Sequence, residues 1–316
     1  MTLNSDNIPE VALGYLAAAK GAALATVIST WGSAPRPVGA QLAIADDGVF
    51  QGSVSGGCVE GAVILAAQDA IRDGKCRVLE YGVADEDAFA VGLACGGNIQ
   101  ILVEPIGIGD GPDKQLLKDA IQAVKTRKAF ACSVNLMDWS RERLNPTGLI
   151  SGKQGNLFIH VTNPNLRMII VGAVHVTQTL APLARMAGYD VLLVDPRDSF
   201  ASKVRFPDDT FIDAWPDEAL AQIGLDGHTA VITLSHDPKI DTPALAAALQ
   251  SDAFYIGALG SRKTHAKRVA QLQDDGFSDT EIARIHGPIG LDIGAKTPAE
   301  IAVSIMAEVT ERLRKP

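Results

Sequence analysis

A cysteine that follows a run of glycines and serines is the residue of this chain best placed to do chemistry. Ser55, Gly56 and Gly57 precede Cys58, and residues 59–72 follow with the apolar spacing of a helix. Glycines allow a sharp turn or the close approach of a ligand. At a helix start, unpaired N–H groups and the helix dipole favour an anion and can lower the pKa of a thiol. The segment therefore predicts either a reactive, anion-binding cysteine or a small buried cysteine in a tight turn.

A second cysteine also lies beside two glycines. Cys95 and Gly96 begin a Cys-Gly-Gly sequence at the entrance of an expected strand. This recurrence favours a shared chemical role over two unrelated turns. The other two cysteines, Cys76 and Cys132, lie in apolar strand patterns and are expected to be core residues. The hairpin expected after Cys132, at residues 138–155, is given no chemical role.

An arginine between two prolines is the nearest candidate for an anion partner. Pro35 and Pro37 hold the backbone around Arg36 extended, so that its guanidinium projects from a stiff loop. Such a group can form paired hydrogen bonds with a phosphate or a carboxylate, although a surface salt bridge is the ordinary alternative. An expected hairpin, with its turn at residues 46–48, connects this loop to the Cys58 segment, so both loops can face one cleft.

The second half of the chain alternates short apolar strands with helices, which predicts a parallel sheet covered on both faces. Gly172 directly follows the first strand, and Asp195 comes about 20 residues later, as in a dinucleotide-binding turn and its ribose-binding carboxylate. Val174 and Thr177, however, replace the second and third glycines of that turn, and a side chain at position 174 would crowd a pyrophosphate. The turn therefore disfavours NAD(P), which stays the alternative cofactor.

Two further polar segments follow strands of this half, at the sheet edge where ligands of α/β proteins bind. His236 and Asp237 follow one strand, and Gly260, Ser261 and Arg262 follow the next and begin a helix. Main-chain N–H groups and a cation at such a helix start can hold an anion. The adjacent Ser, His and Asp of the first segment do not indicate a hydrolase triad, because neighbouring side chains point apart.

Composition and charge limit the classes of function. The chain has 316 residues, enough for two domains, which we place at residues 1–162 and 163–316. A net charge of −9 and the lack of a long basic run argue against a nucleic-acid partner. The four cysteines have neither zinc-site spacing nor disulfide density, so we expect reduced thiols. With no signal peptide and no membrane-spanning apolar run, we expect a cytoplasmic protein.

Seven segments taken together resemble the XdhC/CoxI family, the xanthine dehydrogenase accessory proteins. They are residues 32–40, 52–60, 95–97, 194–197, 233–237, 255–262 and 285–304, in order over both halves of the chain. The resemblance implies an α/β protein, with an N-terminal mixed α/β XdhC/CoxI-type domain followed by a Rossmann-like parallel-sheet domain. It also implies a chaperone that binds molybdenum cofactor (molybdopterin), assists its sulfuration with a cysteine desulfurase, and inserts it into a molybdenum hydroxylase apo-enzyme such as xanthine dehydrogenase. Family members usually carry G-x-G-H-V-G at the turn where this chain lacks the second and third glycines.

Under this hypothesis the cysteines contact the metal or sulfur of the cofactor, and N–H groups and cations hold its anionic arm. Thiolates suit a soft metal such as molybdenum and can relay sulfur. The expected cofactor-binding residues are Arg36, Ser55, Gly56, Gly57, Cys58, Cys95, Gly96, Gly172, Asp195, His236, Asp237, Gly260, Ser261 and Arg262, with Cys58 and Cys95 as the metal ligands and no catalytic residue. We expect a maturation chaperone rather than a catalyst, and a homodimer, because a carrier must cover a labile ligand.

Two other classes of function stay open. One is an NAD(P)-dependent oxidoreductase with its substrate site in the N-terminal domain, which predicts tight NAD(P) binding. The other is an interaction protein that touches no cofactor, which leaves the two cysteine and glycine elements without a purpose. Molybdenum, pterin fluorescence and NAD(P) measured on one purified sample separate the three classes.

Overall fold

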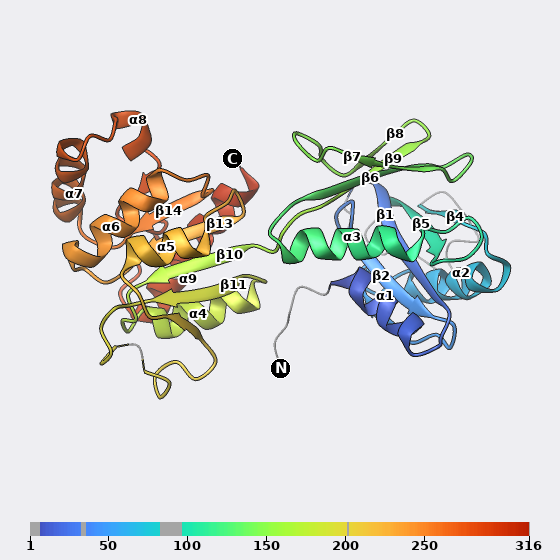
Figure 1. Cartoon of the computed structure of the whole chain (residues 1–316), viewed down its shortest axis with the longest axis horizontal. Coiled ribbons are helices and arrows are strands. Elements are labelled where there is room, and N and C mark those ends of the chain that lie inside the picture. The colour runs from blue at the N-terminus through green and yellow to red at the C-terminus, as the bar shows by residue number, and fades with distance from the viewer. Residues whose placement is uncertain (1–6, 33–35, 83–96, 201, 316) are drawn as a thin grey trace. The chain divides into compact units, whose positions relative to one another are not determined.

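The computed structural model of the chain describes residues 7–32, 36–82, 97–200 and 202–315 (Figure 1). Within it the chain divides into two compact units, of which the first ends at Pro164 and the second begins at Asn165. Each unit has its own sheets and its own buried clusters of apolar side chains.

The first unit is built on an antiparallel five-stranded sheet in the order β3-β2-β1-β5-β4. Its strands are β1 (Ala22–Trp31), β2 (Gln41–Ala45), β3 (Phe50–Gly52), β4 (Arg77–Tyr81) and β5 (Asn98–Pro105). Side chains alternate between the two faces of β1, as the period of a strand requires. Ala23 and Ala25 pack with the core under α2 (Glu60–Asp73), whereas Leu24 packs with residues of α1 (Ile8–Ala17) on the other face. Both faces of this sheet are therefore covered.

A second antiparallel sheet, of four strands in the order β7-β6-β9-β8, completes this unit. Its strands are β6 (Phe130–Asn135), β7 (Arg141–Leu144), β8 (Gly152–Gln154) and β9 (Leu157–Thr162). Ile28 and Leu102 of the first sheet pack with Val134 and Phe158 of the second, so the two sheets share a core. Between them in sequence, α3 (Lys114–Lys125) starts at the N-cap Asp113, whose side chain accepts a hydrogen bond from the Gln115 main chain.

The second unit is a parallel six-stranded sheet in the order β12-β11-β10-β13-β14-β15 (Figure 1). Its strands are β10 (Arg167–Val171), β11 (Asp190–Val194), β12 (Thr210–Ile212), β13 (Thr229–Thr233), β14 (Tyr255–Ala258) and β15 (Ile285–His286). This is the Rossmann order, so the predicted α/β class with a Rossmann-like parallel sheet is confirmed. The order reverses between β10 and β13, where ligands of such sheets bind.

Helices cover both faces of this parallel sheet, which explains why its central strands are almost wholly apolar. They are α4 (Thr177–Met186), α5 (Pro216–Ile223), α6 (Pro238–Leu249), α7 (Arg262–Asp274), α8 (Asp279–Ile282) and α9 (Pro298–Arg314). Met168 and Ile170 face the core with α4 and α9, and Ile169 and Val171 face the core with α5 and α6. The last helix begins with a capping box between Thr297 and Glu300.

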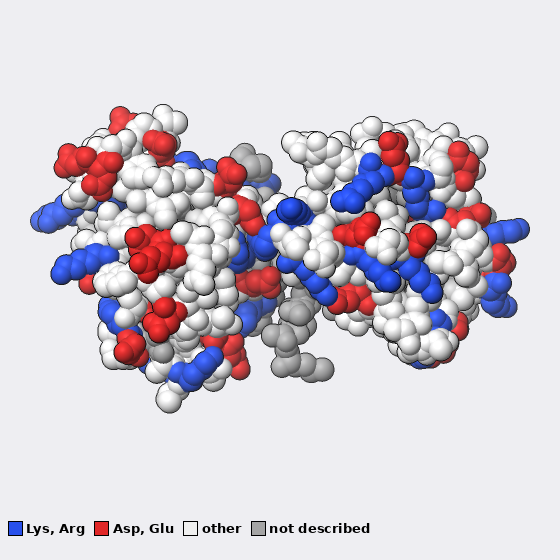
Figure 2. All heavy atoms as spheres, in the orientation of Figure 1, with Lys and Arg blue, Asp and Glu red and all other residues white. Residues whose placement is uncertain are grey.

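Charged side chains of both signs are interspersed over each unit on the face drawn in Figure 2. The chain as a whole has an acidic excess, with a net charge of −9. Among the residues that the structure describes, no helix has the length and apolarity needed to cross a membrane.

Candidate functional site

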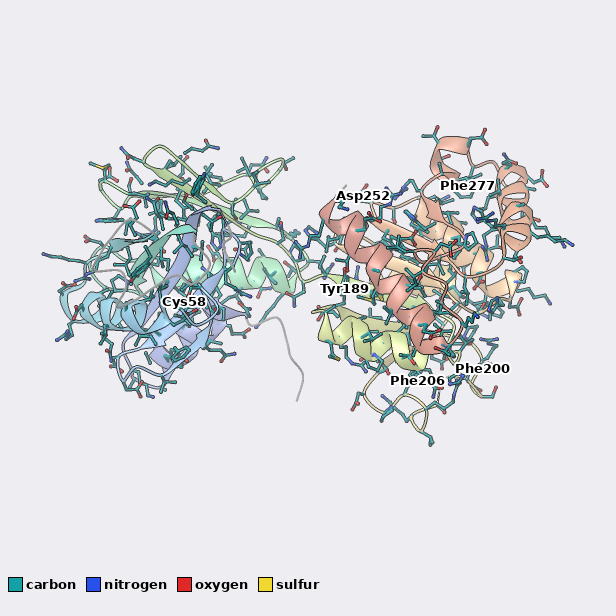
Figure 3. All side chains as sticks on the ribbon, turned by 180° about the vertical axis from the view of Figure 1, so that it is seen from behind. Cys58, Tyr189, Phe200, Phe206, Asp252 and Phe277 are labelled. Carbon is teal, nitrogen blue, oxygen red and sulfur yellow. The ribbon has the colours of Figure 1, made fainter. Side chains whose placement is uncertain are left out.

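Cys58 lies directly before α2, next to the N-cap Val59, so the predicted helix start at this cysteine is confirmed. Figure 3 shows its position beside that helix. The side chain is half-buried and packs against the apolar cluster under α2, with part of its surface open. Cys58 is therefore anchored in the fold and still accessible.

The carboxylate of Glu60, the first residue of α2, organises the loop that precedes it. It accepts hydrogen bonds from the Ser53 hydroxyl at 2.8 Å and from the main-chain nitrogens of Val54, Ser55 and Gly57 at 3.2, 2.9 and 2.9 Å. The Ser55 hydroxyl also donates to it. Burial opposes ionisation of this side chain, which is 8% exposed, but the hydrogen bonds from Ser55 and Ser53 lower the pKa of Glu60 to about 2.

These bonds correct the expectation that the glycine amides of the loop are open donors. Gly57 N–H donates to Glu60, and Gly56 N–H donates to the Ser53 hydroxyl at 2.9 Å. The sequence shows that the loop has donors, and the structure shows that the Glu60 carboxylate and the Ser53 hydroxyl already accept from them. The signal that was missed is a Glu three residues after Gly57, the spacing of the return bond in a capping box.

Arg36 contacts the start of the segment that leads to Cys58, whereas the cleft shared by the two loops stays a prediction. Arg36 Nε donates to the Ser53 carbonyl oxygen at 3.2 Å, while the Arg36 side chain itself is exposed. An exposed guanidinium thus lies at the start of the segment that ends in Cys58. Cys95 and Gly96, the other predicted residues of this half, lie outside the residues that the structure describes.

A buried ion pair in the same unit is the feature that the sequence missed. Arg141, on the hairpin to which we assigned no chemistry, places Nη2 2.6 Å from Glu104 Oε1, and both side chains are nearly buried. Arg141 Nη2 also lies 3.6 Å from Cys76 Sγ. Cys76 is a core residue, as predicted, and burial raises the pKa of its thiol to about 12. Cys132, in contrast, borders a cavity and is only partly enclosed by core atoms.

In the second unit, Asp195 is fully engaged within the protein. It is 2% exposed at the end of β11 and accepts from Ala173 N–H at 2.7 Å and from Arg197 Nε and Nη2, each at 2.8 Å. Burial opposes its charge, but the bonds from Arg197 and Ala173 lower the pKa of Asp195. The Arg197 guanidinium also lies over the Phe200 ring, 3.9 Å from its centroid; Figure 3 labels this phenylalanine. The ribose of a dinucleotide could bind Asp195 only by replacing its hydrogen bonds with Ala173 and Arg197.

The glycine turn after β10 is tightly closed. Gly172 has φ +108°, and a Cβ there would lie 2.7 Å from the Ser235 main-chain nitrogen. Thr177 is buried, and its hydroxyl donates to the Gly172 carbonyl at 2.6 Å. Val174 is partly buried against the core of this unit. The turn thus uses its side chains for internal packing and leaves little space for a pyrophosphate.

The remaining predicted residues separate into helix caps and exposed groups. Asp237 caps α6 by accepting from Lys239 N–H at 2.9 Å, and Ser261, which follows Gly260, caps α7 through Thr264 N–H at 3.1 Å. His236 and Arg262 are exposed, and His236 has φ +63°. A left-handed non-glycine residue in a ligand-binding edge is a strained position of the kind found at functional sites.

Spare hydrogen-bonding capacity lies beside these residues. Asp241, 1% exposed on α6, accepts from the Ser235 hydroxyl at 2.6 Å through Oδ1, and its Oδ2 lies 3.6 Å from Arg268 Nη2. Asp241 Oδ2 and Arg268 Nη1 are buried without a hydrogen-bond partner among the described side chains and main chain. Burial raises the pKa of Asp241, although the hydrogen bond from Ser235 and the charge of Arg268 oppose that rise. A polar ligand group or water at this edge would satisfy both atoms.

Comparisons with known proteins cover both units. Residues 15–82 match the model of the XdhC and CoxI family, and residues 168–309 match that of the XdhC Rossmann domain. The chain is 33% identical to an Escherichia coli protein named molybdenum cofactor insertion chaperone PaoD, over 98% of this chain and 89% of that one. It is 27% identical to a Bacillus subtilis protein named as a probable xanthine dehydrogenase subunit, over 93% and 94%. A crystal structure from Bacillus halodurans, described as that of a xanthine dehydrogenase, has a TM-score of 0.78 and 25% identity, over 97% and 95%.

Proposed function

Because the chain belongs to the XdhC/CoxI family, we propose that it binds molybdenum cofactor and assists its sulfuration and insertion into a molybdenum hydroxylase such as xanthine dehydrogenase. An accessory role toward a molybdenum enzyme follows from the family and from the relative named a molybdenum cofactor insertion chaperone. The observation that supports cofactor binding best is the accessible Cys58 thiol in the same loop system as the exposed Arg36. A soft metal with an anionic arm needs these two kinds of group.

In this proposal Cys58 is the metal or sulfur contact of the first unit, with Cys95 as the second. Arg36 holds the anionic arm, Ser55 and Gly57 contribute only when Glu60 releases them, and Gly56 contributes only when the Ser53 hydroxyl releases it. When bound, the cofactor supplies the molybdenum and its dithiolene sulfurs. The residues of the chain bind and orient it, and the half-buried position of Cys58 keeps the thiol fixed against α2.

The second unit contributes the edge of its parallel sheet. His236 and Arg262 are the exposed groups that would contact the ligand, whereas Gly172, Asp195, Asp237, Gly260 and Ser261 shape the edge through internal bonds. The unpartnered atoms of Asp241 and Arg268 add a place for a polar group. We propose residues 1–162 and 163–316 as the two functional domains, a cysteine desulfurase and the apo-enzyme as partners, a homodimer as the assembly, and the cytoplasm as the location.

NAD(P) is not favoured as the cofactor. Arg197 and Ala173 already use the carboxylate oxygens of Asp195, and Thr177 closes the turn that would hold a pyrophosphate. An NAD(P)-dependent oxidoreductase would need both positions.

The test is to purify the protein from cells that make molybdenum cofactor and to measure molybdenum, pterin fluorescence and NAD(P) on the same sample. We expect molybdenum and pterin in the wild type and a loss of both in Cys58→Ala. Cys132→Ala is the matched control, because it also removes one thiol of the first unit but leaves the Cys58 loop intact. Equal cofactor content in Cys58→Ala and the wild type would show that Cys58 is not a ligand, and NAD(P) alone on the sample would support the oxidoreductase.

A further inference from the structure

The first unit contains a cavity of about 60 Å³ on the face of the five-stranded sheet that is turned away from α2. Leu24 and Thr26 of β1 line it, whereas the residues between them, such as Ala25, pack under α2 with Cys58. Because side chains alternate along a strand, the sheet itself separates this cavity from the Cys58 loop. The cavity is therefore not part of the site described above.

The lining of the cavity is partly apolar and partly polar. Residues of α3, including Leu117 and Ala120, are apolar, as are the phenylalanines of β6 and β9. The polar residues of the lining are Thr26, Gln41, Glu104, Cys132, Arg141 and His160. Polar groups around a space larger than one water molecule indicate a site that holds water or a ligand.

The guanidinium of Arg141, the charged donor among these residues, is already used within the protein. Arg141 donates to Glu104 Oε1 through Nε and Nη2, and to the main-chain oxygens of Asp110 and Trp139 through Nη1. Gln41 Nε2 donates to the Thr26 hydroxyl oxygen at 3.1 Å. Few hydrogen atoms are therefore left for an incoming molecule, chiefly that of the Thr26 hydroxyl, which only accepts in this bond.

Acceptors, in contrast, remain. Within the part of the chain that the structure describes, no protein group donates to Gln41 Oε1 or to the second carboxylate oxygen of Glu104. The main chain of Gly39 forms a hydrogen bond with the His160 ring, and burial lowers the pKa of His160 to about 4. A neutral imidazole that donates from one nitrogen presents the other as an acceptor.

We propose that this cavity binds a small uncharged molecule that donates N–H hydrogen bonds, of the size and chemistry of a primary amide. The free acceptors require a donor, and the apolar wall of α3 favours a compact carbon skeleton opposite it. A cation is disfavoured because the Arg141 charge already balances Glu104, and an anion is disfavoured because it would meet the unused acceptor oxygens of Gln41 and Glu104. By volume, about 60 Å³ holds roughly four waters, or a molecule of four to five non-hydrogen atoms.

The occupant would lie next to the loop that positions Arg36. His160 contacts Gly39, which is in the same loop as Arg36, and Gly39 N–H donates to the Val27 carbonyl at 2.8 Å. The inference does not depend on the proposed cofactor chemistry, because every group that defines the cavity is on the opposite face of the sheet from Cys58.

The experiment compares four molecules of nearly equal shape by saturation-transfer NMR titration of the full chain. Acetamide offers N–H donors, acetone offers none, acetate is an anion and acetamidinium is a cation. We expect acetamide to bind with a dissociation constant in the millimolar range, as four non-hydrogen atoms allow. Acetone is expected to bind at least about fivefold more weakly, because it makes no N–H bond. Acetate and acetamidinium are expected to bind more weakly still.

Two variants and a control locate the binding. Ala120→Leu fills the cavity from α3 and should abolish acetamide binding, while Gln122→Leu, exposed on the same helix, should leave it unchanged. Gln41→Met keeps the side-chain volume and removes one acceptor. It should therefore raise the dissociation constant of acetamide about fivefold while the protein stays folded. Equal binding of acetamide and acetone, binding that survives Ala120→Leu, or no binding of acetamide at all would each overturn the proposal.

Discussion

Replacing Glu60 by glutamine tests the bond network that shapes the Cys58 loop. The amide has the size of the carboxylate, so the packing of α2 is preserved. Its NH₂ group, however, must lie where a carboxylate oxygen now accepts from Gly57 N–H and the Ser55 hydroxyl. The variant therefore places a donor against a donor at Gly57 and removes the negative charge at the start of α2.

The size of the effect follows from the pKa of this group. A carboxyl pKa lowered from 4.5 to about 2 corresponds to about 3 kcal/mol of stabilisation of the charged form. Hydrogen bonds partly re-form with the amide oxygen, so we expect Glu60→Gln to lower the free energy of unfolding by about 2 kcal/mol at pH 7. Glu142→Gln, an exposed carboxylate of β7, is the matched control and should change it by less than about 0.5 kcal/mol.

The pH dependence gives a second and independent measurement. Because the folded-state pKa of Glu60 is lower than the unfolded one, its stabilisation is complete above pH 4.5 and is lost as the pH falls toward 2. Urea unfolding followed by circular dichroism should therefore show the difference between the wild type and Glu60→Gln shrinking as the pH falls from 4.5 toward 2. A difference that is constant with pH, or a variant as stable as the wild type at pH 7, would refute the network as described.

Three other substitutions test the remaining features. Arg141→Met leaves Glu104 buried and unpaired, so urea unfolding should show a free energy of unfolding lower by about 3–5 kcal/mol. Adding Glu104→Leu should restore most of it, and an Arg141→Met variant as stable as the wild type would contradict the buried ion pair. Asp195→Asn should lower the thermal unfolding midpoint by an amount equivalent to about 1–3 kcal/mol, because it removes the charged acceptor of the buried hydrogen bonds from Ala173 and Arg197. An unchanged midpoint would argue against these hydrogen bonds. Gly172→Ala should lower the free energy of unfolding by at least about 2 kcal/mol more than Gly276→Ala. Both glycines have positive φ, but a Cβ at Gly276 meets no atom within 4 Å. Equal losses of stability would show that the turn after β10 is not tightly closed.

The parallel sheet could be predicted because its signal is local. Residues 168–171 are apolar without alternation, which happens only where both faces of a strand are covered. The strands of the first unit were also visible, but their order was not. In the order β3-β2-β1-β5-β4, β1 pairs with β5 across more than 60 residues of chain, and no local pattern records such a pairing.

The site was predictable in its outline and not in its bonds. The turn at residues 46–48 correctly indicated the hairpin that returns the chain, and Arg36 contacts the start of the segment that leads to Cys58. The acceptor of the loop amides could not be predicted, because it depends on which side chain the folded backbone brings next to them; in the structure it is Glu60. Arg141 escaped notice because its partner Glu104 is on another sheet. Charges buried by tertiary contacts leave no trace in a hydropathy pattern.

The carboxylate in the loop before α2 also acts as a built-in competitor. Because Glu60 is joined to the loop by three residues, its effective concentration at those amides is on the order of millimolar or higher. Under the proposed function, a free phosphate or sulfate below that level would not displace Glu60, whereas a molecule that also engages the Cys58 thiol and the Arg36 guanidinium would. In that proposal, the Glu60 carboxylate makes the loop selective for ligands that contact several of its groups at once.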